Sequence, residues 1–189
     1  NPVALQNIKH GEDFMVLDGR YQKQEQEEQV VLGVKKGQKK TIKRNGKPYD
    51  KISDHIGFIP LVIISPSDRD LITEGSETRR KFIDGVIAQG DAQYLRNLLD
   101  YQKTLGQRNA LLKYFHLNHT FDDETLSIYN EQLSTLGHAI YEKRRLFIET
   151  FLPIFAERYR FISQGKERVH IDYKSQLHEE ELKGLLVQN

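Results

Sequence analysis

The sequence lacks cysteine and any long apolar run. Without cysteine, the chain has no disulfide framework, no thiolate nucleophile and no cysteine-based zinc site, which fits a reducing cytoplasm. The longest apolar run, residues 58–64, contains Pro60 and is far too short to span a bilayer. Residues 1–5 carry neither a basic start nor a long apolar core, so we interpret them as the cut end of an excised segment and not as a signal peptide. We therefore expect a cytoplasmic protein without a membrane segment.

The motifs of nucleotide and metal chemistry are also missing. The sequence contains neither GxxxxGK[ST] nor GxGxxG, the two glycine-rich patterns whose backbone cradles phosphates. The run from His178 resembles the zinc motif HExxH, but Leu182 occupies the position of the second histidine. His116 and His119 are spaced for one helix face, yet a third ligand is not evident. We predict no catalytic residue and no metal site in this chain.

Length and composition limit the number of domains and the kinds of partner. The chain has 189 residues, of which 38% are hydrophobic and 29% are charged, so it can form one substantial domain or two small ones. The formal net charge is only +1. Overall charge therefore does not argue for nucleic acid, and any such argument must rest on local clustering.

The first third of the chain predicts antiparallel hairpins. β-branched runs alternate with turn residues, and Asn45–Gly46 is the strongest short-range turn signal. Leu61–Ile64 is continuously apolar, which predicts a strand buried on both faces, and Pro66 closes it. The other expected elements are a turn at Asp18–Gly19, a strand at Val30–Val34, a turn at Lys36–Gln38 and a strand at Thr41–Arg44.

A basic stretch coincides with the predicted hairpin. Residues 35–47 contain seven basic residues and no acidic one: Lys35, Lys36, Lys39, Lys40, Lys43, Arg44 and Lys47. Such a hairpin is a candidate DNA-binding surface, because each neutralised phosphate releases counterions. The alternative is a lysine-rich edge that prevents sheets from aggregating. No aromatic residue interrupts the basic ones, so base stacking is not expected here.

The remaining two thirds predict helices. Asp68 or Ser67, Ser76 and Asp91 can cap three successive helix starts, and Gly75 and Gly90 can end helices between them. A later repeat alternates intervals of three and four residues and predicts an antiparallel pair of long helices. Its members are Leu126, Tyr129, Leu133, Leu136, Ile140, Phe147, Phe151 and Ile154. Thr120 or Asp122 can cap the helix that carries this repeat.

The end of the helical region carries three further predictions. Pro153 should break or kink the second long helix near Leu152, and Gly165 should end the region. Val169–Tyr173 alternates and predicts a strand that returns to the sheet, before a last helix begins at Gln176. We predict an α+β fold with a β-rich part at 1–66, a helical lobe at 67–165, and a return strand and further helix at 166–189.

Charged residues recur along the predicted helices. The spacing suits pairs between Arg80 and Asp84 and between Arg96 and Asp100 on solvated helix faces. From spacing alone, this structural interpretation is favoured over a functional one.

Three ordered motifs carry a more specific signal. They read SPSD from Ser65, GSETRRKFID from Gly75 and QRNALLK from Gln107. Together they resemble the RecF family, recombination mediators of the ABC/SMC-like ATPase class, and the resemblance covers nearly the whole chain. The motif residues singled out by it are Gly75, Arg79, Arg80, Asp84, Gln107, Arg108 and Asn109.

The resemblance implies a parent protein that binds ATP and Mg, dimerises around the nucleotide and binds DNA at single/double-strand junctions. With RecO and RecR it would load recombinase at single-strand gaps, and it would be a weak DNA-dependent ATPase. The family's phosphate loop, signature and Walker B motifs have no match here, so this chain is predicted to be inactive and to hold no cofactor. It resembles the central part of the family's proteins.

The SPSD corner resembles the Q-loop of related ATPases, which senses the nucleotide. The residues at this place are Ser65, Pro66, Ser67 and Asp68. The family more often has an acidic residue where Ser67 stands and an apolar one where Arg69 stands, which weakens the assignment. Two functional hypotheses remain open: a DNA- and partner-binding part of a repair ATPase, or an architectural helical arm without DNA contact.

Overall fold

A computed structural model describes residues 2–187. The chain divides into a sheet unit, Asn1–Leu61, and a helical unit, Val62–Asn189, and each is described by itself. Strands occur only in the first unit and long helices only in the second, among the described residues. The predicted α+β class is therefore confirmed, whereas the three-part domain division stays a prediction.

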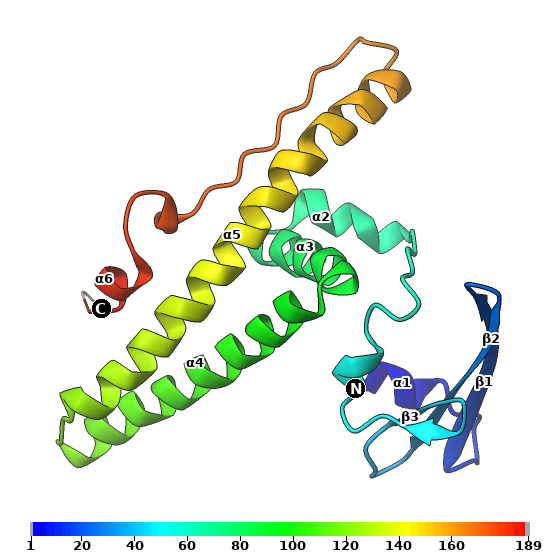
Figure 1. Cartoon of the computed structure of the whole chain (residues 1–189), viewed down its shortest axis with the longest axis horizontal. Coiled ribbons are helices and arrows are strands. Elements are labelled where there is room, and N and C mark those ends of the chain that lie inside the picture. The colour runs from blue at the N-terminus through cyan, green and yellow to red at the C-terminus, as the bar shows by residue number, and fades with distance from the viewer. Residues whose placement is uncertain (1, 188–189) are drawn as a thin grey trace. The chain divides into compact units, whose positions relative to one another are not determined.

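The sheet unit contains one antiparallel sheet in the order β1-β2-β3-β4 (Figure 1). Its elements are α1 (Pro2–Gln6), β1 (Phe14–Lys23), β2 (Gln26–Lys35), β3 (Thr41–Arg44), β4 (Lys47–Pro48) and the 3-10 turn η1 (Ile52–His55). Asn45 and Gly46 join β3 to β4 with φ of 48° and 79°, the backbone that a two-residue hairpin turn requires. The turn predicted there is confirmed.

The first hairpin differs from the prediction. Gln24 and Glu25, with φ of 48° and 66°, turn β1 into β2, although neither is a typical turn residue. Gly19, which the sequence placed in a turn, lies within β1 opposite Val30. The prediction of a turn at Asp18–Gly19 is wrong because ten cross-strand pairs fix the register of β1 and β2.

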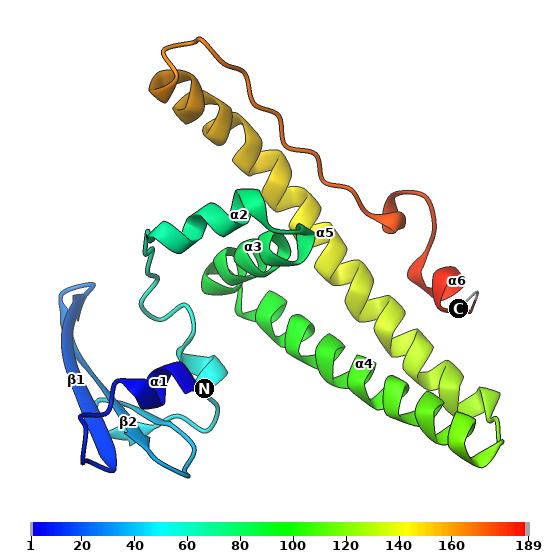
Figure 2. The same cartoon turned by 180° about the vertical axis from the view of Figure 1, so that it is seen from behind.

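The helical unit is built on two long antiparallel helices with a third packed against both (Figures 1 and 2). Its elements are η2 (Pro66–Arg69), α2 (Asp70–Thr73), α3 (Ser76–Gly90), α4 (Ala92–Asn118), α5 (Asp123–Ile162), η3 (Gln176–His178) and α6 (Leu182–Val187). Asp91 caps α4 by accepting from the Tyr94 backbone N–H at 2.9 Å, and Asp122 caps α5 by accepting from Thr125 at 3.1 Å. Both caps had been expected from the sequence.

The predicted seam lies between α4 and α5 over its first half. Leu126, Leu133 and Ile140 are buried, whereas Ile154 is exposed. The helix continues through Pro153, so the predicted break is wrong. Pro153 is exposed, so water can satisfy the backbone carbonyl that its missing N–H leaves free.

Two segments predicted as strands are not strands. Leu61–Ile64 has no regular secondary structure, and its four side chains are between 62% and 89% exposed, which contradicts the predicted buried strand. Residues 166–175, including Val169–Tyr173, are also irregular and run back along α5 (Figure 2). Alternation and apolarity favour an extended backbone, but a strand also requires pairing with a neighbouring strand, and none of the described strands pairs with either segment.

The last helix packs closely on α5. A Cβ atom on Gly137 would lie 2.4 Å from Leu182 Cδ2, so any larger residue at this position would require the Leu182 side chain to move. Arg108 of α4 is buried and donates to Asn130 Oδ1 at 2.7 Å and to the Leu186 carbonyl at 3.1 Å. None of the described helices is both long and apolar enough to cross a membrane.

We expect Leu133→Ala to lower the free energy of unfolding by about 2–5 kcal/mol, because it leaves a cavity where a side chain is 0% exposed. Leu146→Ala on the same helix is the matched control, since Leu146 is 55% exposed. Chemical denaturation followed by circular dichroism measures both. Equal stabilities of the two variants would contradict the observed packing of α5.

Candidate nucleic-acid interface

The two faces of the sheet divide the basic residues. Lys43 lies opposite Val31 on β2, and Lys35 is four positions from Val31 on that strand, so both lysines are on one face. Arg44 lies opposite Lys47, so these two belong to the other face. The sequence had treated the seven residues as one surface, which the strand alternation does not allow.

Arg44 is engaged inside the sheet unit. Its Nε donates to Glu28 Oε2 at 2.9 Å, its Nη2 also donates to Glu28, and Asn45 Nδ2 donates to the same carboxylate at 2.7 Å. The guanidinium lies 3.9 Å from the centre of the Phe58 ring. These hydrogen bonds lower the pKa of the Glu28 carboxyl and raise that of Arg44. Arg44 therefore holds the hairpin together and is a poor candidate for DNA contact.

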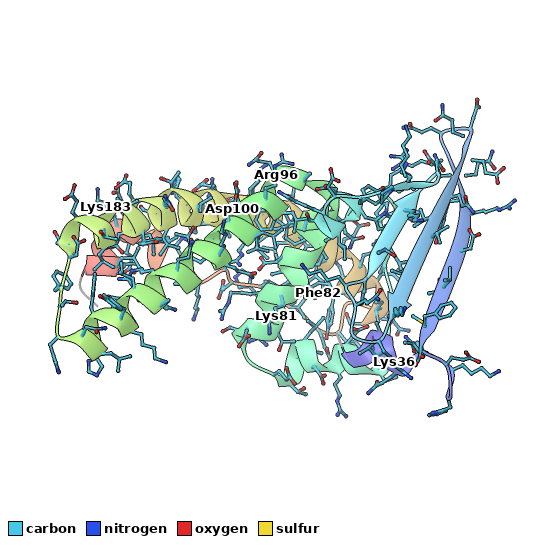
Figure 3. The ribbon with its side chains drawn as sticks, turned by 90° about the horizontal axis from the view of Figure 1, so that it is seen from below. Lys36, Lys81, Phe82, Arg96, Asp100 and Lys183 are labelled. Carbon is cyan, nitrogen blue, oxygen red and sulfur yellow. The ribbon has the colours of Figure 1, made fainter. Side chains whose placement is uncertain are left out.

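Lys36 is also engaged. Its Nζ donates to the Glu12 carbonyl at 2.6 Å and lies 3.6 Å from an Asp13 carboxylate oxygen (Figure 3). The five other basic residues form no ion pair within the described part of the chain: Lys35, Lys39, Lys40, Lys43 and Lys47. These five are the cations available to an anionic partner.

The loop lysines border a cavity on the second face. Lys39 and Lys40 line a space of about 750 Å³ together with Val34 and Ile42. Val34 and Ile42 alternate with Lys35 and Lys43 along their strands, so they belong to the opposite face. The five available cations thus form two groups, Lys35/Lys43 on one face and Lys47 on the other face with Lys39/Lys40 beside it.

The Q-loop-like corner is a local turn at the start of the helical unit. Asp68 accepts from the Ser65 backbone N–H at 2.7 Å, and the Asp68 N–H donates back to the Ser65 carbonyl at 3.0 Å. Pro66 and Asp68 are exposed, and the Ser67 side chain lies outside the described part. These two hydrogen bonds are enough to account for the conformation of residues 65–68, and a role in nucleotide sensing stays a prediction.

The GSETRRKFID motif joins three helices. Asp84 of α3 accepts from Arg144 Nε and Nη2 of α5, both at 2.8 Å, and from the Tyr94 hydroxyl of α4 at 2.5 Å. The Asp84 and Arg144 side chains are 13% and 19% exposed, and Tyr94 is fully buried. Burial raises the pKa of the Tyr94 hydroxyl, and its hydrogen bond to Asp84 raises that pKa further. For Arg144, burial acts to lower the pKa, but the hydrogen bond to Asp84 contributes to a net rise.

The helix-surface pairs expected from spacing are not formed. Arg80 donates to Ser76 Oγ at 2.9 Å instead of pairing with Asp84. Arg96 donates to Gln93 Oε1 at 2.7 Å, although Asp100 lies on the same helix (Figure 3). The prediction considered only pairs four residues apart on one helix, whereas the arginine that binds Asp84 is Arg144, 60 residues away in the sequence.

The other motif residues have structural places. Arg79 donates to the Leu71 and Glu74 carbonyls at 3.0 and 2.8 Å and closes the end of α2. Gly75 precedes α3 with φ of −71°, which other residues can also adopt. Gln107 and Asn109 are exposed beside the buried Arg108. The described residues hold no group of three His, Asp or Glu that could bind a metal.

The sequence did not predict the contacts that three residues make in these networks. Glu28 and Phe58 fix Arg44, and Arg144 completes the Asp84 network. The signal available for Glu28 was cross-strand alternation, which places it on the Arg44 face once the register is known.

Comparison with known proteins gives close relatives. The chain is 61% identical over 189 residues to the "DNA replication and repair protein RecF" of Flavobacterium johnsoniae and covers 53% of it. It is 47% identical over 176 residues to the protein of the same description from Phocaeicola vulgatus, matching 93% of this chain and 47% of the relative. The chain thus spans about half the length of the curated relatives it matches. No protein-family model matches the sequence.

Solved structures agree with the sequence relatives. A structure of the recombination mediator protein RecF-ATP in the RecFOR pathway superposes with a TM-score of 0.84 at 29% identity, covering 96% of this chain and 51% of that one. The RecF-ATPrS structure gives a TM-score of 0.82 at 29% identity over 96% of this chain and 49% of that one.

The Glu28–Arg44 pair predicts a pH dependence of the sheet unit. Because the pKa of Glu28 is lowered on folding, its contribution to stability is complete above its usual value of 4.5 and is lost as pH falls through the folded-state value. The protection factors of the β2 and β3 amides, which are exchange rates relative to the intrinsic rates at the same pH, should fall below that pH in the original chain.

The variant Glu28→Gln should remove much of that pH dependence while lowering protection near neutral pH. Asp18→Gln on β1 is the control, since Asp18 is exposed and Gln29 is the one side chain in the described part of the chain that bonds to its carboxylate. A Glu28→Gln profile that parallels the original one would rule out this role for the pair.

Proposed function

Because this chain belongs to the RecF family, we propose that it serves in a DNA replication and repair protein as a DNA-binding and partner-binding segment. The observation that carries the proposal is the set of five lysines on and beside the β2–β3 hairpin that form no ion pair with any described residue, in a chain of net charge +1. Lysines on a hairpin can reach successive phosphates without reading bases.

The parent protein, in this proposal, binds ATP with Mg, dimerises in that state and engages DNA at single/double-strand junctions in the cytoplasm. It works with RecR and RecO to load recombinase at single-strand gaps. Solved relatives described as RecF-ATP in the RecFOR pathway support this part of the proposal. The segment itself contributes positive charge and a rigid helical unit.

The architectural alternative has a specific observation in its favour. Arg44 and Lys36, two of the seven basic residues, are fully explained by contacts within the sheet unit. If the other lysines only discourage strand pairing at the edge, the segment acts as a helical arm and does not touch DNA. Charge-reversal experiments separate the two functions.

The isolated chain should show no ATPase activity and no nucleotide affinity in the micromolar range. A phosphate-cradling loop and metal-binding carboxylates are required to neutralise the triphosphate, and the sequence has no such motif. Turnover assays and calorimetry with ATP and Mg measure this. ATP hydrolysis that co-purifies with the chain through successive columns would refute the expectation.

Duplex DNA binding should be sequence-independent and salt-sensitive. If three or four lysines contact phosphates, log affinity should fall against log salt with a slope of about −3. Fluorescence anisotropy should show weaker binding by Lys39→Glu/Lys40→Glu/Lys43→Glu, in this chain and in the ATP-bound parent.

Two double variants then identify the face that is used. Lys35→Glu/Lys43→Glu tests the first face and Lys39→Glu/Lys40→Glu tests the loop, and each lost phosphate contact should reduce the slope by about 0.9. Lys103→Glu/Lys113→Glu on α4 makes the same change in net charge as each double variant, at exposed positions of the helical unit. If each double hairpin variant binds as tightly as this control, and the triple variant binds as tightly as the original with the same salt slope in both contexts, the architectural function is favoured.

A further inference from the structure

We propose that the helical unit contains a second, separate anion-binding site that accepts a phosphate group. It is a cavity of about 260 Å³ between the start of α3 and the segment that runs back along α5. The basic residues that line it are Arg79, Arg80, Arg144 and Lys174, against a single acidic residue, Asp172. The site does not depend on the hairpin, which belongs to the other unit.

The acidic groups near this cavity are already paired. Asp84 binds Arg144 at 2.8 Å, and Asp172 lies 2.6 Å from His170 Nε2. On α3 itself, Glu77 binds Lys81 at 2.7 Å. These pairs leave Arg79, Arg80 and Lys174 without an ion pair among the described residues. His170 is charged only when protonated, so the carboxylate of Asp172 offsets one of these three cations. The remaining excess of positive charge around the cavity creates a positive potential that attracts an anion.

The donors at the cavity suit phosphate. Arg79 uses Nη1 for the Leu71 and Glu74 carbonyls, and Arg80 uses Nη1 for Ser76 Oγ, which fixes both side chains while their other N–H groups carry no hydrogen bond in the described structure. A fixed guanidinium fork binds phosphate oxygens with two parallel hydrogen bonds. Lys174 adds a point charge from the opposite wall.

The same chemistry fits two sources of phosphate. A free phosphate compound could enter the cavity whole, and a nucleic-acid backbone could place one phosphodiester at its mouth. Arg79 and Arg80 both come from the GSETRRKFID motif. Each guanidinium uses Nη1 for a hydrogen bond within the protein, and the proposed phosphate would bind its remaining N–H groups.

The test uses the whole chain with two probes, inorganic pyrophosphate followed by calorimetry and a labelled duplex followed by anisotropy. The variant is Arg80→Ala/Lys174→Ala, which spares Arg79 because Arg79 also closes α2. The control is Lys81→Ala/Arg96→Ala, which removes two positive charges from α3 and α4 (Figure 3), at residues that do not line the cavity. Circular dichroism checks that both variants melt like the original.

We expect the variant to bind pyrophosphate about tenfold more weakly than the control, because two charge-assisted contacts are lost. A parallel loss of duplex affinity assigns the site to a nucleic-acid backbone, and an unchanged duplex affinity assigns it to a free phosphate compound. If the original chain does not bind pyrophosphate, or the variant binds both probes as the control does, the site does not exist. Hairpin variants leave pyrophosphate binding unchanged, so the two proposals fail separately.

Discussion

The Asp84–Arg144 ion pair is the interaction on which the helical unit depends. One carboxylate accepts hydrogen bonds from two nitrogens of a guanidinium and from a tyrosine hydroxyl, so a single partly buried group joins α3, α4 and α5. Removing either charge would leave its partner buried and uncompensated, at a cost of about 3–5 kcal/mol. The geometry also admits only one register of α5 against α3, because the fork must meet both carboxylate oxygens.

The sequence predicted the parts of the fold that are encoded locally. Asn45 and Gly46 specify their turn by backbone preference, and Asp91 and Asp122 cap helices through hydrogen bonds that span three residues. Helix spacing also predicted the burial of Leu133. In each case the residues that determine the structure lie within one or two turns of chain.

Errors arose where a distant partner decides the outcome. Leu61–Ile64 has the composition of a buried strand, but no sequence pattern reports whether a neighbouring strand is present. Gln24 and Glu25 form a turn because the pairs on either side of them hold the hairpin. The basic hairpin was located correctly as a concentration of charge, yet only the register shows that Arg44 faces Glu28 and that the lysines divide between two faces.

The length of α5 gives the Asp84 pivot a mechanical consequence. From Arg144 to Ile162 the helix extends about 27 Å at 1.5 Å per residue. A rotation of about 10° around the ion pair therefore sweeps the far end through roughly 5 Å, the scale of one helical turn. A displacement of a few tenths of an ångström beside Arg144 would therefore move the Ile162 end of α5 far enough to form or break a contact there.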